Sequence, residues 1–101
     1  MRRGEVWRYR SVIEREGRSP LRLILSADSL IASSSVPTVY GAHFADTDPQ
    51  SLVAVRVGEF GWANLVEIDR PLRSRLIERV GEATTVEMEQ IDNALRATFE
   101  L

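Results

Sequence analysis

The chain has 101 residues, of which 44% are hydrophobic, and this is enough for one domain with a modest core. No apolar run approaches the roughly 20 residues that cross a bilayer, and the N-terminus lacks the apolar segment of a signal peptide, so we expect a cytoplasmic protein with no membrane partner. The absence of cysteine excludes disulfides, zinc–thiolate sites and thiol catalysis.

The net charge of −2 hides an asymmetry along the chain. Residues 1–22 hold seven arginines and three glutamates, a balance of +4, so the remaining residues carry −6. The basic charge is therefore concentrated at one end, whereas the overall balance argues against a general nucleic-acid coat protein.

Two strands and a hairpin loop are predicted at the N-terminal end. Residues 4–13 are rich in aromatic and β-branched side chains, and residues 21–25 alternate leucine with other side chains, Arg22 among them. The polar residues 14–19 form the loop between them, and Pro20, which cannot donate a ladder hydrogen bond, suits the start of the second strand. Asp28 then suits the cap of a short helix that extends to residue 34.

Three more strands are predicted over residues 36–44, 52–57 and 62–68. In the second of these, alternation places Val53, Val55 and Val57 on one core-facing side. Residues 46–50, rich in Asp and Pro, form a turn, and the glycines at 58 and 61 permit a tight reversal.

The last third of the sequence changes to a helical period. Pro71 suits the first turn of a helix to about residue 80, with Gly81 as its stop. A second helix follows Thr84, which is spaced for a capping box with Glu87. One face of this helix carries apolar side chains that serve either the core or a dimer surface: Met88, Ile91, Ala94, Leu95 and Phe99.

Five short strands and an amphipathic C-terminal helix indicate a mainly β fold, a small SH3-like barrel closed by that helix. At this level the chain resembles the MazF/PemK toxin family. The similarity is carried by the polar loop, the basic residue and Pro before an apolar strand ending in Ser26-Ala27-Asp28, and a later strand ending near a Thr. Residues 61–72 and 80–84, followed by the last helix, are similar to the family's closing segment. The resemblance implies a single MazF/PemK-like domain over residues 1–101 with a CcdB/PemK-like barrel.

The resemblance also implies a function. Members of this family are homodimeric toxins of type II toxin-antitoxin systems that cleave single-stranded RNA through 2'-hydroxyl attack, without a metal or other cofactor. A cognate antitoxin covers the site with an acidic C-terminal segment. The family places an Arg directly before the Pro of the second strand and a Thr at the end of the third. Here Ser19 precedes Pro20, with one additional residue before Ser26, and Ala45 stands at the Thr position.

The catalytic pair of the family has therefore either moved or been lost. The candidate catalytic residues are Arg18, Ser19, His43 and Thr47. The candidate RNA-binding residues are Arg15, Arg22, Asp46 and Trp62. His43 suits proton transfer near neutral pH, and the arginines suit phosphate binding. The alternatives are a packed or solvated strand histidine, ordinary surface arginines on a hairpin, an Asp-rich turn that binds no metal, and packing for Trp62.

Two other functions stay open on the sequence alone. A relative of the gyrase poison CcdB would bind a protein target and leave RNA intact during growth arrest. A barrel module that binds a peptide would cause no growth arrest.

Overall fold

The structure is a computed structural model that describes residues 1–11 and 19–101. Within these residues the chain forms six strands, two α-helices and one 3-10 turn. In chain order they are β1 (Glu5–Tyr9), β2 (Leu21–Ile24), α1 (Asp28–Ile31), β3 (Gly41–Ala45), β4 (Ala54–Val57), β5 (Gly61–Asp69), η1 (Arg73–Arg75), β6 (Leu76–Glu82) and α2 (Thr85–Phe99).

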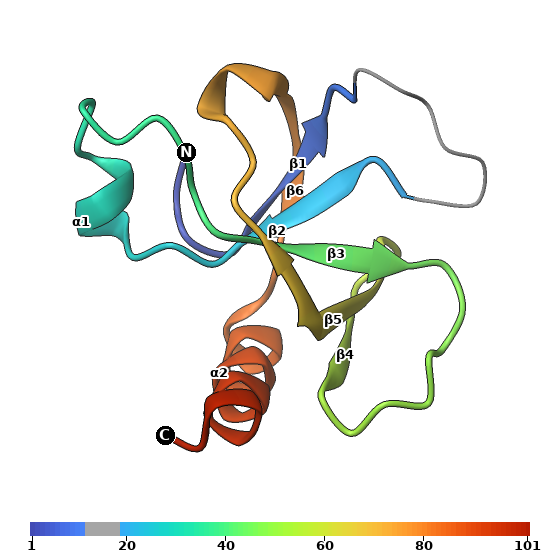
Figure 1. Cartoon of the computed structure of the whole chain (residues 1–101). Helices are drawn as coiled ribbons and strands as arrows, with labels where there is room; N and C mark the ends of the chain where they lie inside the picture. The colour runs from blue at the N-terminus through green and yellow to red at the C-terminus, as the bar shows by residue number, and fades with distance from the viewer. Residues whose placement is uncertain (12–18) are drawn as a thin grey trace.

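The strands form one antiparallel sheet in the order β4-β5-β3-β2-β1-β6. Figure 1 shows the sheet strongly twisted, with α2 packed beside the β4 and β5 end of it. The predicted class, mainly β with a C-terminal helix, is confirmed. The described strands number six, so the prediction of about five is too low.

The additional strand is β6, which replaces the helix predicted for residues 71–80. That prediction is wrong: after the short turn η1, residues 76–82 pair with β1 along its full length. The pairing sets Trp7 opposite Arg79, and the Arg79 guanidinium lies 2.9 Å from the Glu5 carboxylate on β1. Helix propensity is a weak preference, and an available strand edge overrides it here.

The two faces of the sheet bury different clusters because side chains alternate along each strand. Leu23 on β2 points to the face covered by α2, called here the helix face, and Ile24 points to the opposite, outer face. The main core lies on the helix face and contains Val6, Leu23, Leu25, Ala42, Phe44, Val55, Val57, Ala63, Leu65, Ile91 and Ala94. A smaller cluster on the outer face contains Ile24, Ile31, Val39 and Leu76. The predicted inward face of residues 52–57 is confirmed, since Val55 and Val57 are buried and Val53 packs against them.

Helix α2 begins as predicted. Thr84 and Glu87 form the full capping box, and Ile91 and Ala94 are buried against the sheet. Burial raises the pKa of Glu87, but backbone hydrogen bonds from Thr84 and Gly58 outweigh it and hold this pKa below its ordinary value. The apolar stripe departs from the core at its end, where Phe99 is 59% exposed.

Several element boundaries differ from the predictions. The third strand starts only at Gly41, because residues 37–39 bond to residues 71–73 and form just an isolated bridge, between Thr38 and Leu72. The predicted cap by Asp28 is wrong: Ala27 is the N-cap, and the Asp28 carboxylate accepts from the Arg3 N–H instead. The end of the predicted first strand and nearly all of the predicted hairpin loop lie outside the described residues.

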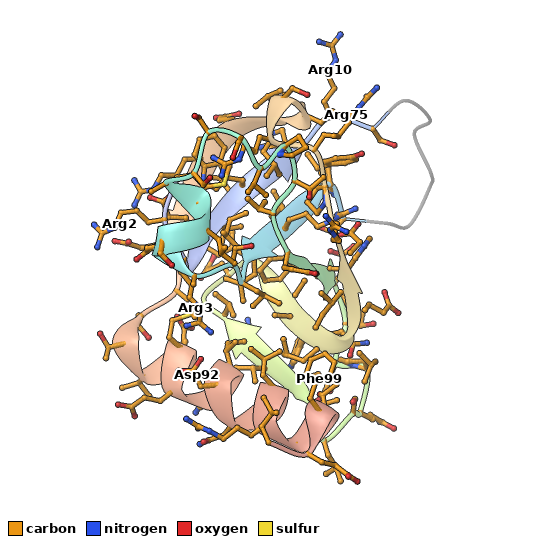
Figure 2. The ribbon with its side chains drawn as sticks, turned by 60° about the vertical axis from the view of Figure 1, so that its left-hand side comes forward. Arg2, Arg3, Arg10, Arg75, Asp92 and Phe99 are labelled. Atoms are coloured by element: carbon orange, nitrogen blue, oxygen red, sulfur yellow. The ribbon has the colours of Figure 1, made fainter. Side chains whose placement is uncertain are left out.

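The N-terminal segment is connected to α2 by an ion pair. Figure 2 shows Arg3 above Asp92, and the Arg3 Nη2 lies 2.7 Å from the Asp92 Oδ1. The Arg3 Nε also donates to the Leu25 carbonyl at 3.0 Å. No helix in the described ranges is both long and apolar enough to span a bilayer.

The turn between β4 and β5 confirms the predicted tight reversal and depends on two glycines. Gly58 and Gly61 have φ angles of 48° and 112°, both in the left-handed region. A Cβ on Gly61 would collide with the Ala45 carbonyl of β3, whereas a Cβ on Gly58 would meet only the Phe60 ring at 3.8 Å. Gly61 therefore sets how closely the start of β5 approaches the end of β3.

We expect Gly61→Ala to lower the free energy of unfolding by about 2–4 kcal/mol, through both backbone strain and the collision. Gly58→Ala, the matched control, has the strain alone and should lose about 1 kcal/mol. Urea unfolding of both variants measures the difference. Equal losses would show that the contact with Ala45 carries no cost.

Candidate functional site

A cavity of about 480 Å³ lies where β2 begins and β3 ends. Ser19, Pro20 and Leu21 line it from the start of β2, and Asp46 lines it from the residue after β3. The remaining lining residues are Arg8, Glu59, Phe60 and Val80. The structure thus brings together two of the predicted site residues, Ser19 and Asp46, from segments far apart in the sequence.

The charges around this cavity are mixed. Its described lining holds one cation, Arg8, and two carboxylates, Asp46 and Glu59. Arg8 is also paired with Glu78 at 3.3 Å. The Ser19 hydroxyl accepts from the Leu21 N–H at 3.2 Å, which leaves its own proton available to donate. A phosphate bound in this cavity would therefore need positive charge from arginines outside the described lining.

A second group of predicted residues meets on the outer face. His43 on β3 stands directly opposite Arg22 on β2, and both contact the carboxylate of Asp69 at the end of β5. The His43 Nε2 lies 2.8 Å from the Asp69 Oδ2, and the Arg22 Nε lies 3.3 Å from the same oxygen. One carboxylate oxygen therefore serves two side chains from two strands.

An irregularity in β5 positions this carboxylate. Ala42 pairs with Ile68, but the next residue, His43, pairs with Asn64, so residues 65–67 of β5 have no partner on β3. Such an irregularity re-aims the side chains beyond it. It places Asp69 on the outer face beside His43 and Arg22.

Two effects act on the pKa of Asp69 in opposite directions. Burial raises it, while the hydrogen bond from His43 and the positive charge of Arg22 lower it, and the lowering effects win. Asp69 is therefore ionised at neutral pH and accepts a hydrogen bond from the His43 Nε2. Its second oxygen, Oδ1, is buried without a hydrogen-bond partner in the described part of the chain.

Arg22 is held in place from several directions. Its side chain is only 9% exposed, its Nη1 donates to the Leu21 carbonyl at 3.0 Å, and its guanidinium lies 5.0 Å from the centre of the Tyr9 ring. A buried arginine with these partners orients Asp69, and through it His43. The His43 side chain keeps 20% of its surface exposed, so it remains accessible from the outer face.

Trp62 lies on the same outer face, at the start of β5. It pairs with Arg56 on β4 and with Ala45 on β3, and the Arg56 guanidinium covers its ring at 4.9 Å from the centre. Of the other predicted residues, Thr47 is exposed after β3, and Arg15 and Arg18 lie outside the described residues. The described site residues thus fall into a cavity group and an outer-face group on either side of the end of β3.

Sequence reasoning missed Asp69, Tyr9 as the partner of Arg22, and Arg56. No local pattern marks Asp69, because its role depends on the irregularity in β5 and on pairing with a distant strand. Arg56 carried a signal in the alternation of β4, which places it outward between Val55 and Val57. Within residues 1–11 and 19–101, no three His, Asp or Glu side chains are arranged to share a metal ion.

The fold is similar to that of solved structures along the whole chain. An endoribonuclease from mycobacterial species has a TM-score of 0.83 at 22% identity, and the match covers 100% of this chain and 92% of that one. A mycobacterial endoribonuclease in complex with its cognate antitoxin has a TM-score of 0.84 at 22% identity, and the match covers 100% of this chain and 96% of that one. A crystal structure of MazE–MazF from Deinococcus radiodurans has a TM-score of 0.80 at 13% identity, and the match again covers 100% of this chain and 96% of that one.

No protein-family model and no curated protein sequence matches the chain. The structural likeness, at these identities, shows the fold. The chain therefore has a MazF-like fold, which confirms at that level the resemblance seen in its sequence.

We expect Asp69→Asn to lower the free energy of unfolding at pH 7 by about 1–3 kcal/mol, because the buried Arg22 loses its anionic partner. The pKa of Asp69 is lowered in the folded state, so its contribution is complete above the ordinary value of 3.8 and disappears as the pH falls below it. The gap between wild type and variant should therefore narrow in acid. Urea unfolding at pH 7 and at about pH 3 measures it.

Asp92→Asn is the matched control. Asp92 and Asp69 are both 39% exposed, but the partner of Asp92, Arg3, is 30% exposed while Arg22 is 9% exposed. The control should lose less than about 1 kcal/mol at pH 7. A gap for Asp69→Asn that stays constant between the two pH values would contradict the assigned pairing.

Proposed function

We propose that this chain is the toxin of a type II toxin-antitoxin pair, a metal-independent endoribonuclease that cleaves single-stranded RNA. The observation that carries the proposal is the whole-chain likeness in fold to endoribonucleases, with and without an antitoxin. The polar groups on either side of the end of β3 supply residue types that the reaction needs. These are a histidine held by a carboxylate, a serine hydroxyl and nearby arginines.

The proposed reaction is an internal transesterification. The ribose 2'-oxygen forms a bond to the adjacent phosphorus, the bond from phosphorus to the 5'-oxygen breaks, and the products are a 2',3'-cyclic phosphate and a 5'-hydroxyl. A base must take the 2'-hydroxyl proton, an acid must protonate the leaving oxygen, and positive charge must stabilise the pentacoordinate phosphorane. All three roles are open to side chains without a metal.

We assign proton transfer to His43, with Asp69 and Arg22 as positioning residues. Asp69 accepts from one ring nitrogen and thereby fixes the tautomer, which leaves the other nitrogen to exchange a proton with RNA. The Ser19 hydroxyl would donate a hydrogen bond to the RNA from the cavity side. Arg18 and Thr47 remain candidate catalytic residues, and Arg15, Asp46 and Trp62 remain candidate RNA contacts. RNA that crosses the end of β3 would reach both groups of side chains.

The proposal extends to partners and assembly. We infer a cognate antitoxin whose acidic C-terminal segment binds the excess of arginine in residues 1–22, by charge complementarity. We also infer a homodimer, in which a second copy would cover apolar groups such as the exposed Phe99. We further propose that the twisted sheet, together with α2, corresponds to the small SH3-like barrel predicted from the sequence. We also infer a cytoplasmic location, because the proposed substrate is cellular RNA.

We expect the purified protein to cleave single-stranded RNA in EDTA and to leave 5'-hydroxyl ends. Such ends accept a labelled phosphate from a polynucleotide kinase without phosphatase treatment, which distinguishes them from 5'-phosphate ends. Cleavage that requires a divalent cation would contradict the proposed chemistry. Growth arrest with intact RNA would instead indicate a protein target of the CcdB kind, and no growth arrest would indicate a peptide-binding module.

We expect His43→Asn to lower the cleavage rate by about 10²–10⁴-fold, the usual contribution of a general acid or base. Asp69→Asn should shift the pH profile of cleavage as well as lower the rate, because it changes how the imidazole is held. Single-turnover cleavage across a range of pH measures both effects, with Asp92→Asn as the control. Arg18→Ala should abolish cleavage, because Arg18 is a candidate to supply positive charge to the reacting phosphate. Full activity in His43→Asn would remove His43 from the proposed mechanism.

A further inference from the structure

The pair of Arg56 and Trp62 forms a stacked cation and aromatic ring on the outer face of β4 and β5. The two residues are direct cross-strand partners, and the guanidinium carbon lies 4.9 Å from the ring centre. Both side chains point away from the helix face, because their neighbours Val55, Val57 and Ala63 are in the main core. The pair is therefore a surface feature and takes no part in the packing against α2.

Arg56 carries a charge that the described part of the chain does not neutralise. It takes part in none of the salt bridges found there, and only its Nε has a hydrogen bond, to the Gly58 carbonyl at 3.2 Å. That bond and the ring beneath fix the plane of the guanidinium while its terminal nitrogens remain free to donate. A planar, exposed and unpaired guanidinium suits two ligand groups, an unpaired base on its open side and a phosphate at its edge.

The register of the sheet places this pair beside the candidate site. Trp62 pairs with Ala45, and the next residue after Ala45, Asp46, lines the cavity. Two positions along β5, Asn64 pairs with His43. Diagonal cross-strand neighbours lie about 7–8 Å apart, so Trp62 and His43 lie within reach of one nucleotide and its neighbour.

We propose that Arg56 and Trp62 form a subsite for one unpaired nucleotide of a single-stranded nucleic acid, next to the reacting phosphate. The base stacks on the open side of the Arg56 guanidinium, which Trp62 supports from below, and the terminal nitrogens of Arg56 contact a backbone phosphate. The identity of the ligand as RNA rests on the proposed function. The subsite itself requires only an unpaired base and a phosphate.

The test measures binding without cleavage. The probe is a short, mixed-sequence 2'-O-methyl RNA single strand, which lacks the attacking hydroxyl and so stays intact. Binding should quench the tryptophan emission of the wild type, and Trp62→Phe, which retains Trp7, should abolish that change. Arg56→Ala should weaken binding about tenfold or more and reduce the slope of log affinity against log salt by about 0.7, the value for one phosphate on a single strand.

Two further variants separate stacking from charge. Arg56→Lys keeps the charge but loses the plane, so it should retain the salt slope and still bind more weakly. Arg70→Ala is the matched control, because Arg70 is another exposed arginine stacked on an aromatic ring, 5.6 Å from the centre of Tyr40, and bonded to Thr38. It should bind like the wild type. Circular dichroism and thermal unfolding confirm that each variant is folded.

Three results would overturn the subsite. These are wild-type emission that does not change with saturating probe, equal affinity of Arg56→Ala and Arg70→Ala, and equal affinity for a duplex of the same sequence. Cleavage of unmodified RNA is measured separately. Intact RNA together with the expected binding would reject the endoribonuclease and keep the subsite, whereas cleavage with no effect of Arg56→Ala on binding would do the reverse.

Discussion

The carboxylate of Asp69 is the interaction on which the outer face depends. Arg22 and His43 come from two neighbouring strands, and both reach the same oxygen at the end of a third strand. Without an anion at this point, a buried guanidinium would have no compensating charge, and the imidazole would lose the group that fixes its orientation. A single side chain therefore couples the stability of the sheet to the geometry of its candidate acid-base group.

Side chains along β2 alternate between the two faces of the sheet, and each face has a different role. Leucines on one side anchor the sheet to the core beneath α2, and Arg22 on the other side organises the polar cluster. The cavity lies where the strand begins, with Ser19 at its edge. The hydrophobic core thus fixes the position of both polar groups, since a shift of β2 by one residue would exchange its two faces.

The sequence predicts correctly those parts of the fold that depend on the spacing of neighbouring residues. The capping box at Thr84 and the inward valines of β4 follow from spacing alone, and both are present. The sequence of β6 has no strong strand period and so does not predict a strand; pairing with β1 makes it extended. The same limit applies to the site. His43 and Arg22 were selected by residue type, but their common partner Asp69 depends on a strand irregularity that sequence does not reveal.

The position of β1 within the sheet has a consequence for synthesis of the protein. β1 lies between β2 and β6, so its second edge is filled only by residues 76–82. A ribosome must release the chain through residue 82 before this edge is covered, and through residue 99 before α2 can close over the core. Pairing between such distant segments forms late, because a long loop must be closed first. A nascent chain that stalls before β6 would expose an open strand edge, a target for proteases and chaperones, and would lack a finished sheet.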